Sequence, residues 1–380
     1  MLTTDVFIAG GGPAGLATAI ATRQLGLDAI VADLVKPPVD KACGEGLMPD
    51  GVAALRRLGI EPDATEAHPF RGIRFITDDA TAAANFPRAQ GLGIRRTVLH
   101  QMLMRRAEEA GVVMRWGTRV DGLDERGDVR LGGDTVLCKW IIGADGHNSR
   151  IRRATMAQPH VSTDRVGVRQ HFCARSWTDL VEVYWHPRGQ AYVTPIADGE
   201  ICIAIIGTDS GVRIGDLGRF FPLLAARLKD AAPASASRAG RSASSTLRSV
   251  ARGRVALVGD ASGSVDAVTG DGLSLAFCQA LALADALADQ NLARYQTAHR
   301  RIMRMPRIMS RLLTLIGEHD GLRHRAIHAL AARPTAFARL LAVHAGAASP
   351  SSIGLGTIAG LGWELLANRR VAAATSVRSI

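Results

Sequence analysis

The first 33 residues carry the pattern that most limits how this chain can fold. An apolar run over residues 5–9 leads into the glycine-rich turn 10–15, and an alanine-rich segment then extends to residue 25. A second apolar run ends at Asp33. This order of strand, glycine turn, helix, strand and acid is that of one βαβ unit. We therefore expect two parallel strands joined by a helix, with the glycine turn at the edge of the sheet.

Three glycines of this turn have the spacing G-x-G-x-x-G, which is typical of dinucleotide-binding loops. Gly10 permits the tight turn, Gly12 lets a pyrophosphate approach the backbone, and Gly15 lets the helix pack closely on the strand. Pro13 and Ala14 begin the helix, where a proline has no hydrogen bond to lose. The free amides of the first helical turn and the helix dipole would then face the phosphates.

Asp33 lies about twenty residues beyond the glycine turn, where such folds place an acid. A carboxylate at this position binds a ribose 2′-hydroxyl, which favours NAD or FAD over NADP. A later glycine pattern, over residues 354–360, follows no predicted strand, and we do not count it as a second dinucleotide site.

Composition narrows the class of protein. The chain has 380 residues, of which 47% are hydrophobic and 4% aromatic, and its net charge is +11. The arginines are scattered, so nucleic-acid binding is not expected. A membrane surface, a phosphorylated substrate or a coding bias toward arginine explains the charge better. The five cysteines form no C-x-x-C pair, so we predict no metal, no iron–sulfur cluster and no redox disulfide.

The sequence also predicts the cellular compartment and whether a helix spans the membrane. Dispersed cysteines indicate a reducing compartment, and the first residues enter a strand at once, without a signal peptide. No apolar run reaches the roughly 18 residues that a membrane-spanning helix needs. We expect a cytoplasmic protein that is able to associate with a membrane surface through its apolar tail and basic charge, with a hydrophobic dimer contact as the competing explanation for the tail.

Strand and helix patterns organise the rest of the chain. Short strands separated by turns fill residues 164–207, and a loop is expected over residues 231–245. Two further strand-to-helix joints carry an acid at the turn: Asp145 within residues 141–150, and Asp260 within residues 258–273. The remaining helical patterns cover residues 97–110, 214–228, 272–288 and further segments to residue 344.

The three glycine and acid motifs, in this order and spacing, resemble those of the FAD-dependent monooxygenase and geranylgeranyl reductase superfamily over residues 1–290. The resemblance implies an α/β fold: a Rossmann-like FAD-binding domain of the glutathione-reductase-2 type, a β-sheet substrate domain and a C-terminal helical segment. The implied boundaries are 1–160 with 250–290 for FAD binding, 161–249 with part of 68–95 for the substrate, and 291–380 for the helical region.

The resemblance also implies which residues bind FAD. Asp33 would hold the adenosine ribose, Val120 would meet the adenine through its backbone, and Arg96 would lie near the flavin and phosphates. Asp145 would contact the pyrophosphate region and Asp260 the ribityl or ribose side. The whole implied set is Gly10, Gly12, Pro13, Ala14, Gly15, Asp33, Gly44, Arg96, Val120, Asp145, Gly146, Asp260, Gly270, Gly272 and Leu273.

The motifs leave the chemistry open between oxygenation and reduction. Residues 41–47 look like the Cys-Gly segment of geranylgeranyl reductases, and residues 259–263 lack the histidine that aromatic hydroxylases place there. The reductases' G-Y-x-W-x-F-P motif survives only in part, with Gly189 and Pro195 matching and Tyr192 in place of the tryptophan. Halogenase and electron-transfer-flavoprotein dehydrogenase motifs are absent from the sequence.

We therefore expect an NAD(P)H-dependent flavin monooxygenase that hydroxylates or epoxidises an apolar substrate through a C4a-hydroperoxyflavin. The substrate would be a lipid-tailed aromatic, a polyketide or an isoprenoid. Alternatives are a geranylgeranyl-reductase-like enzyme that saturates C=C bonds and a flavin-binding protein without turnover. NADPH or NADH would reduce the flavin transiently, and the oligomeric state stays open. The predicted substrate-pocket residues are Cys43, Glu45, Tyr192 and Asp266.

Overall fold

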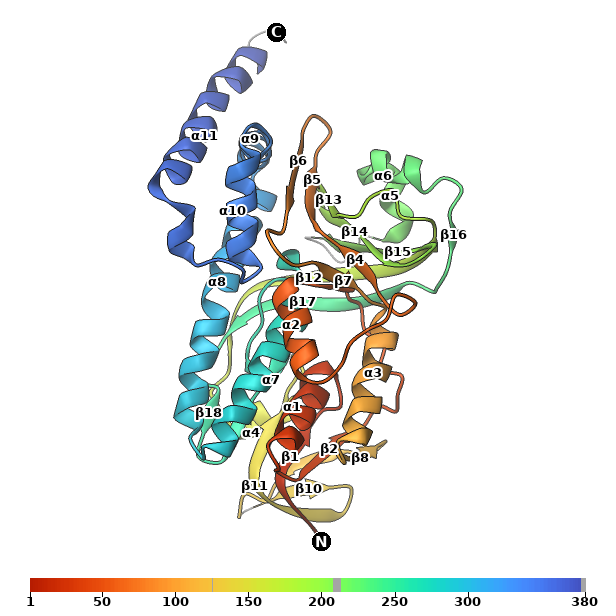
Figure 1. Cartoon of the computed structure of the whole chain (residues 1–380), viewed down its shortest axis with the longest axis vertical. Coiled ribbons are helices and arrows are strands. Elements are labelled where there is room, and N and C mark those ends of the chain that lie inside the picture. Colours follow the sequence, from red (N-terminus) through yellow and green to blue (C-terminus); the bar gives the residue numbers. More distant parts are fainter. Residues whose placement is uncertain (125, 208–212, 377–380) are drawn as a thin grey trace.

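The computed structural model describes residues 1–124, 126–207 and 213–376 and has the predicted mixed α/β fold (Figure 1). The N-terminal motif builds the centre of the first sheet, in which β1, β2, β8, β11 and β19 are parallel to one another, while β10 and β18 pair antiparallel with β11 and β19. Its strands are β1 (Leu2–Ala9), β2 (Ala29–Asp33), β8 (Val113–Trp116), β9 (Val120–Leu123), β10 (Val129–Leu131), β11 (Asp134–Gly143), β18 (Ala251–Arg252) and β19 (Val255–Leu257), in the order β18-β19-β11-β1-β2-β8, with β10 and β9 added to β11.

Helices cover this sheet because its central strands are apolar on both faces. Val6, Phe7 and Ile8 are fully buried, as expected for a parallel strand packed on both sides. Alanines along the first helix let it pack closely against its neighbours in the same core. The helices of this part are α1 (Pro13–Gln24), α2 (Pro49–Arg57), α3 (Arg96–Glu109), α4 (Arg150–Thr155) and α7 (Gly272–Ala288).

The second sheet is antiparallel apart from the parallel pair β13 and β5. Its strands are β5 (Gly72–Ile76), β6 (Thr81–Asn85), β12 (His160–Cys173), β13 (Val181–His186), β14 (Gly189–Ala197), β15 (Glu200–Gly207), β16 (Ala232–Pro233) and β17 (Arg238–Thr246), in the order β16-β12-β15-β14-β13-β5-β6, with β17 paired to β12. A small third sheet links the two parts through β3 (Gly46–Leu47), β7 (Gly91–Gly93) and β4 (His68–Phe70).

Two local expectations were wrong. The loop expected over residues 231–245 contains β17, which pairs with β12 along nine residues from Arg238 to Thr246. Its alanines and serines carry little strand propensity, so the pairing partner decides its conformation. The helix expected over 214–228 is broken into a 3₁₀ turn, α5 (Leu217–Phe220) and α6 (Pro222–Arg227), because Pro222 restarts the helix.

The C-terminal helices close over the second sheet (Figure 1). Ile316, Ile327 and Phe337 from these helices share a buried cluster with Trp185 and Tyr192 from the sheet. The helices are α8 (Leu292–Glu318), α9 (Asp320–Ala332), α10 (Pro334–His344) and α11 (Leu355–Ser376). None of the helices in the described ranges is long and apolar enough to cross a membrane. The predicted domain boundaries stay predictions, and residues 208–212 and 377–380 of the predicted segments lie outside the described residues.

Two buried side chains anchor the long helix α8 to β19 and to the 3₁₀ turn that follows it. The Tyr295 hydroxyl donates to the carbonyl of Leu257 at 2.6 Å, and His299 Nε2 lies 2.9 Å from the Ser262 hydroxyl. Burial, with a smaller contribution from Arg307, lowers the pKa of His299 from 6.5 to about 3. The folded protein therefore holds His299 neutral across the whole physiological range.

We predict a loss of stability on acidification that His299 causes. The unfolded chain binds a proton at this imidazole below pH 6.5, whereas the folded chain does not until about pH 3. Stability therefore falls as the pH drops from 6.5, by about 2 kcal/mol at pH 5. Urea denaturation of wild type and His299→Gln at several pH values measures this. The variant should lose that part of the pH dependence, while His160→Gln, at an exposed position, should keep it; identical slopes for His299→Gln and wild type would refute the assignment.

Candidate functional site

The first glycine turn is held by close backbone contact and by Asp33. A Cβ on Gly15 would lie 1.8 Å from the Gly10 carbonyl oxygen, so only glycine fits there. Gly10 has a φ of +111°, which also favours glycine. The Asp33 Oδ2 accepts a hydrogen bond from the Gly11 amide at 2.7 Å, which fixes this acid at the edge of the cavity described below.

The second and third acid turns lie beside the first. β11 and β19 follow β1 in the sheet, so their carboxyl ends carry the turns at Asp145 and Asp260 to the same edge. Asp260 Oδ2 lies 3.0 Å from Lys41 Nζ and 3.2 Å from His147 Nε2. Burial raises the pKa of Asp260, but Lys41 and His147 outweigh it and hold that pKa below its usual value. The Asp260 carboxylate is therefore ionised.

A cavity of about 730 Å³ runs from these turns to the C-terminal helices. This volume is in the range of small-molecule sites. Every sequence-predicted site residue lines it except Gly15, which lies beneath the first turn. The lining residues from that set are Gly10, Gly12, Pro13, Ala14, Asp33, Cys43, Gly44, Glu45, Arg96, Val120, Asp145, Gly146, Tyr192, Asp260, Asp266, Gly270, Gly272 and Leu273.

The turn end of this cavity fits a dinucleotide such as FAD. A Cβ on any of five lining glycines would meet no other atom of the described chain within 4 Å, so each faces open space on the cavity. Asp145 Oδ1 and Arg96 Nε are buried, and neither has a hydrogen-bond partner among the described residues. Such orphaned polar atoms call for a polar ligand. The five glycines are Gly12, Gly44, Gly146, Gly270 and Gly272.

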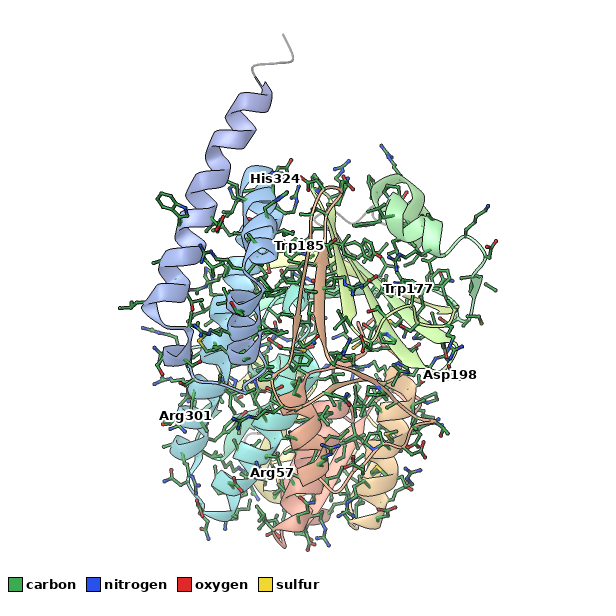
Figure 2. All side chains as sticks on the ribbon, turned by 45° about the horizontal axis from the view of Figure 1, so that its top comes forward. Arg57, Trp177, Trp185, Asp198, Arg301 and His324 are labelled. Carbon is green, nitrogen blue, oxygen red and sulfur yellow. The ribbon has the colours of Figure 1, made fainter. Side chains whose placement is uncertain are left out.

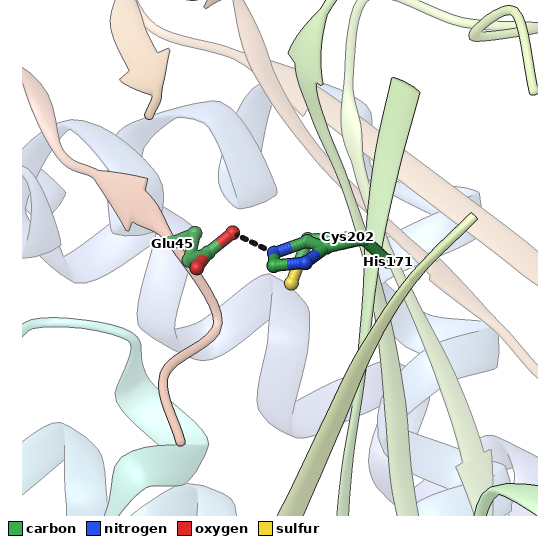
Figure 3. Close-up of side chains that lie close together, drawn as sticks. All are labelled: Glu45, His171 and Cys202. Atoms are coloured by element: carbon green, nitrogen blue, oxygen red, sulfur yellow. Dashed lines mark hydrogen bonds and ion pairs between the residues drawn. The ribbon is translucent and has the colours of Figure 1, made fainter. Parts of the chain in front are cut away.

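Glu45 lies at the centre of a buried polar network (Figure 3). Its Oε1 accepts a hydrogen bond from the Arg96 amide at 3.0 Å, and its Oε2 lies 2.6 Å from His171 Nε2. The Arg169 Nε is 3.7 Å from the same carboxylate, and Arg169 also pairs with Asp40. Glu45 is 2% exposed, so the network joins helix α3 to strand β12 in a water-poor setting.

Two cysteines contact the same network. Cys202 lies beside His171 (Figure 3). Its thiol donates to the Cys43 carbonyl at 3.7 Å. Burial, and then Glu45, raises the pKa of Cys202 well above its ordinary value, so it stays a thiol. Cys43 lines the cavity and its sulfur accepts from the Glu45 amide at 3.4 Å.

Asp266 and Tyr192 position the turn that starts α7. Asp266 is fully buried; its Oδ2 accepts from Thr163 Oγ1 at 3.0 Å and faces Arg165 Nε at 3.2 Å. Its Oδ1 accepts from the Val268 amide at 3.1 Å, and the Tyr192 hydroxyl donates to the Val268 carbonyl at 2.9 Å. Burial, and then Asp266, raises the pKa of Tyr192. Both side chains are therefore occupied by structural contacts.

Sequence patterns missed a buried acid at the start of α7. Asp271 Oδ1 lies 3.3 Å from His344 Nε2 of α10, and Asp271 Oδ2 has no partner among the described residues. Burial, with Asp50 adding and His344 opposing, raises the pKa of Asp271 to about 6. Arg169 and His344 were also missed, because isolated basic residues carry no local motif; only the fold brings them to the cavity. His147 and His171 were expected to be structural or solvent-facing; they contact Asp260 and Glu45 beside the cavity.

Comparisons with known proteins agree with the dinucleotide end of the site. A family model described as an FAD binding domain matches residues 3–189. The chain is similar to the menaquinone reductase of Mycolicibacterium smegmatis, 28% identical over 297 residues that cover 71% of this chain and 72% of that protein. It is also similar to the 3-demethoxyubiquinol 3-hydroxylase of Escherichia coli, 26% identical over 323 residues covering 75% and 80%.

A solved structure shows the same fold. The flavoprotein/dehydrogenase of Cytophaga hutchinsonii superposes with a TM-score of 0.77 at 17% identity, covering 97% of this chain and all of that one. The predicted fold class is thereby confirmed. The match to the FAD binding domain model supports FAD as the cofactor, and the roles of single residues stay predictions.

We predict that Gly12→Ala folds normally but loses FAD. Its added Cβ meets no atom of the described residues within 4 Å, so it would occupy space that the ligand needs. Overpacking of this kind costs about 1–3 kcal/mol, or roughly ten- to a hundredfold in affinity. Flavin absorbance per protein and FAD titration of the stripped protein measure it. Gly218→Ala, an exposed glycine equally free of neighbours, should bind FAD like wild type. Full flavin content in Gly12→Ala would show that Gly12 does not line the FAD site.

Proposed function

We propose that this chain, which is similar to FAD-dependent reductases and hydroxylases, is an FAD-dependent reductase that saturates a C=C bond in an isoprenoid-tailed lipid. The observation that carries the proposal is the single cavity that joins the FAD-binding turns to an apolar chamber. Two of the similar proteins are named for quinones, so a quinone with an isoprenoid tail is the leading substrate class.

The apolar chamber suits a hydrocarbon tail. Phe75, Val183 and Trp185 of the second sheet form one wall, and Trp185 lies where the sheet meets the C-terminal helices (Figure 2). Leu313, Ile316, Ile327, Phe337 and Leu341 of α8–α10 form the other wall. Each buried methylene of a tail gains about 0.8 kcal/mol, so a chamber with such walls favours long apolar substrates.

Backbone amides and side chains of this chain would orient the ligand and supply a proton. When bound, FAD supplies the hydride chemistry, with NADPH or NADH proposed as the reductant. The amides at the start of α7, which Asp266 and Tyr192 hold in place, favour negative charge on the nearest part of the ligand. Saturation of a C=C bond also needs a proton, and the Cys43 thiol on the cavity wall is the candidate donor.

Oxygenation is the second candidate. Sequence motifs favoured it, and the hydroxylase among the similar proteins supports it. The same cavity would serve, because a buried apolar chamber excludes water from a reactive centre. The two chemistries differ in their need for oxygen, so a single experiment separates them.

We expect the reduced holoenzyme to be reoxidised by an isoprenoid quinone without oxygen. The measurement is anaerobic reduction by NADPH or NADH, addition of menaquinone, and mass spectrometry of the lipid. A gain of two hydrogen atoms that remains after the quinone ring is reoxidised in air, and that fragment ions place in the isoprenoid tail, supports the reductase. No anaerobic change in the tail, with a gain of one oxygen atom in labelled oxygen, replaces it with the monooxygenase. Peroxide release with unaltered lipids from both the quinone and isoprenoid classes would refute both and favour a flavin-binding protein without turnover.

Two substitutions of cavity-lining residues test whether the substrate binds and reacts in this cavity. Ala326→Leu narrows the apolar chamber and should raise KM for a long-tailed substrate by about tenfold while sparing a short-tailed one, whereas Ala331→Leu, exposed on the same helix, should not. Cys43→Ala should slow substrate reduction without slowing flavin reduction. An equal effect of Ala326→Leu on both tail lengths would remove the chamber from the binding site.

A membrane surface is the proposed source of such a lipid. Arg301, Arg304 and Arg311 are exposed on α8 and lie on the same face as Ile308, Leu312 and Leu315, which are 42–49% exposed. Arg301 is labelled in Figure 2. Leu355, Ile358 and Trp363 of α11 are also exposed, and Leu312 lines the cavity. Mixed arginine and aliphatic faces are typical of helices that lie on anionic bilayers.

We predict binding to anionic vesicles that weakens in Ile308→Asp and Leu315→Asp. Each substitution removes an apolar contact worth about 1.5 kcal/mol or more, so each should lower vesicle affinity by about tenfold. Sedimentation with phosphatidylglycerol vesicles measures it, and Val161→Asp, an exposed position on β12, is the matched control. Equal sedimentation of all four proteins, or concentration-dependent dimers that Ile308→Asp abolishes without vesicles, would overturn the membrane assignment.

A further inference from the structure

We propose that Asp79, His324 and His328 form a binding site for a divalent transition-metal ion, with Zn²⁺ the best fit. Asp79 Oδ2 lies 2.8 Å from His324 Nδ1 and 3.1 Å from His328 Nε2. The three ligand atoms all lie within 4.8 Å of one another. The site lies outside the FAD-binding turns and outside every segment that the function above uses for chemistry.

The donor set and the geometry both suit zinc. Two imidazoles and one carboxylate are borderline ligands that Zn²⁺ prefers, and a fourth position is left for water. With bonds of about 2.0 Å, two ligands of a tetrahedral ion lie roughly 3.3 Å apart. The observed nitrogen–oxygen separations are shorter by a few tenths of an ångström, so small side-chain rotations would admit the ion.

The ligands come from two elements that lie side by side. His324 and His328 are four residues apart on α9, so they project from one face of that helix. Asp79 lies in the turn between β5 and β6, and β6 packs against α9 (Figure 1). His324 is labelled at the far end of the molecule from the FAD-binding domain (Figure 2). All three side chains are 34–48% exposed, so an ion can enter from solvent.

The carboxylate is ionised and oriented. The Thr77 hydroxyl donates to Asp79 Oδ1 at 2.9 Å, which leaves Oδ2 directed at the two histidines. Burial by itself would raise the pKa of Asp79, but hydrogen bonds from His328 and Thr77, together with His324, lower it. A second-sphere hydrogen bond of this kind is the usual support for a metal-bound carboxylate.

The other cluster of three possible metal ligands in the described part of the chain is a poor metal site. Glu45, His171 and Cys202 also lie within ligand distance of one another. However, the buried Arg169 guanidinium lies 3.7 Å from Glu45 and 3.2 Å from His171, and it already neutralises the carboxylate. A cation would be repelled there, whereas no arginine or lysine pairs with Asp79 among the described residues.

A bound ion would hold the outer wall of the substrate chamber together. Ile73 and Phe75 of β5, and Leu322, Ile327 and Leu330 of α9, line the cavity. The metal would link the turn between β5 and β6 to helix α9. The expected role is therefore stabilisation of the chamber wall, with the ion taking no part in the redox step.

The test is a Zn²⁺ titration of tag-free holoenzyme against a chromophoric chelator in a buffer that does not bind metals. We expect one Zn²⁺ per chain and a higher thermal midpoint with Zn²⁺. His324→Gln, His328→Gln and Asp79→Asn should each weaken binding by about tenfold or more and abolish the thermal shift. His160→Gln, an exposed histidine on β12, should behave like wild type.

Three outcomes would overturn the proposal: no binding by the wild type, binding that survives all three substitutions, or equal loss in His160→Gln. Survival would place the ion elsewhere, such as at the buried Glu45 group. Activity with Zn²⁺ removed is expected to persist, so a failure of the proposed reductase function would leave the metal result unaffected.

Discussion

The contact between two backbone turns is the constraint on which the rest of this structure depends. The Gly10 turn and the Ala144–Asp145 turn lie so close that a Cβ on Gly10 would come within 2.4 Å of the Ala144 carbonyl oxygen. This contact is possible because β1 and β11 are parallel neighbours whose carboxyl ends coincide. With β19 beside them, three separate stretches of chain bring amides and acids to one end of the cavity. Side chains far from the turns therefore affect this end of the cavity by keeping the carboxyl ends of these strands in place.

Buried polar contacts connect these turns to the second sheet, which forms one wall of the cavity. Glu45 has a backbone φ of +60°, which is uncommon for a residue other than glycine, and it persists because its carboxylate binds both α3 and β12. Asp266 likewise ties β12 to the start of α7 through Thr163 and Arg165. Removing either partner would leave a charge buried without compensation, which is far more costly than losing a surface pair. The shape of the cavity therefore depends on buried contacts that join the two sheets.

Sequence reasoning succeeded where one local stretch carries the whole signal. The unit from β1 to β2 and the turns at Asp145 and Asp260 are such stretches, since strand, glycine and acid follow each other directly. It failed for β17, whose alanines and serines form a strand only because β12 offers an unpaired edge. It also could not join Arg169 to Glu45, or Asp79 to His324, because those contacts depend on chain closure over long separations. The apolar chamber was expected only as a property of the substrate, since no pattern in α8–α10 shows which face turns inward.

The two ends of the cavity come from different parts of the chain, and they tolerate substitutions to different degrees. The FAD end comes from motifs in which single atoms are critical, such as Gly15, where even a methyl group is excluded. The chamber end comes from aliphatic residues of α8–α10, where exchange of one apolar side chain for another is tolerated as long as volume is roughly kept. On the proposed function, such exchanges would change the length or branching of the tail that fits, while the FAD-binding end of the cavity stays as it is. The contact between His344 of α10 and Asp271 at the start of α7 joins the two ends of the cavity.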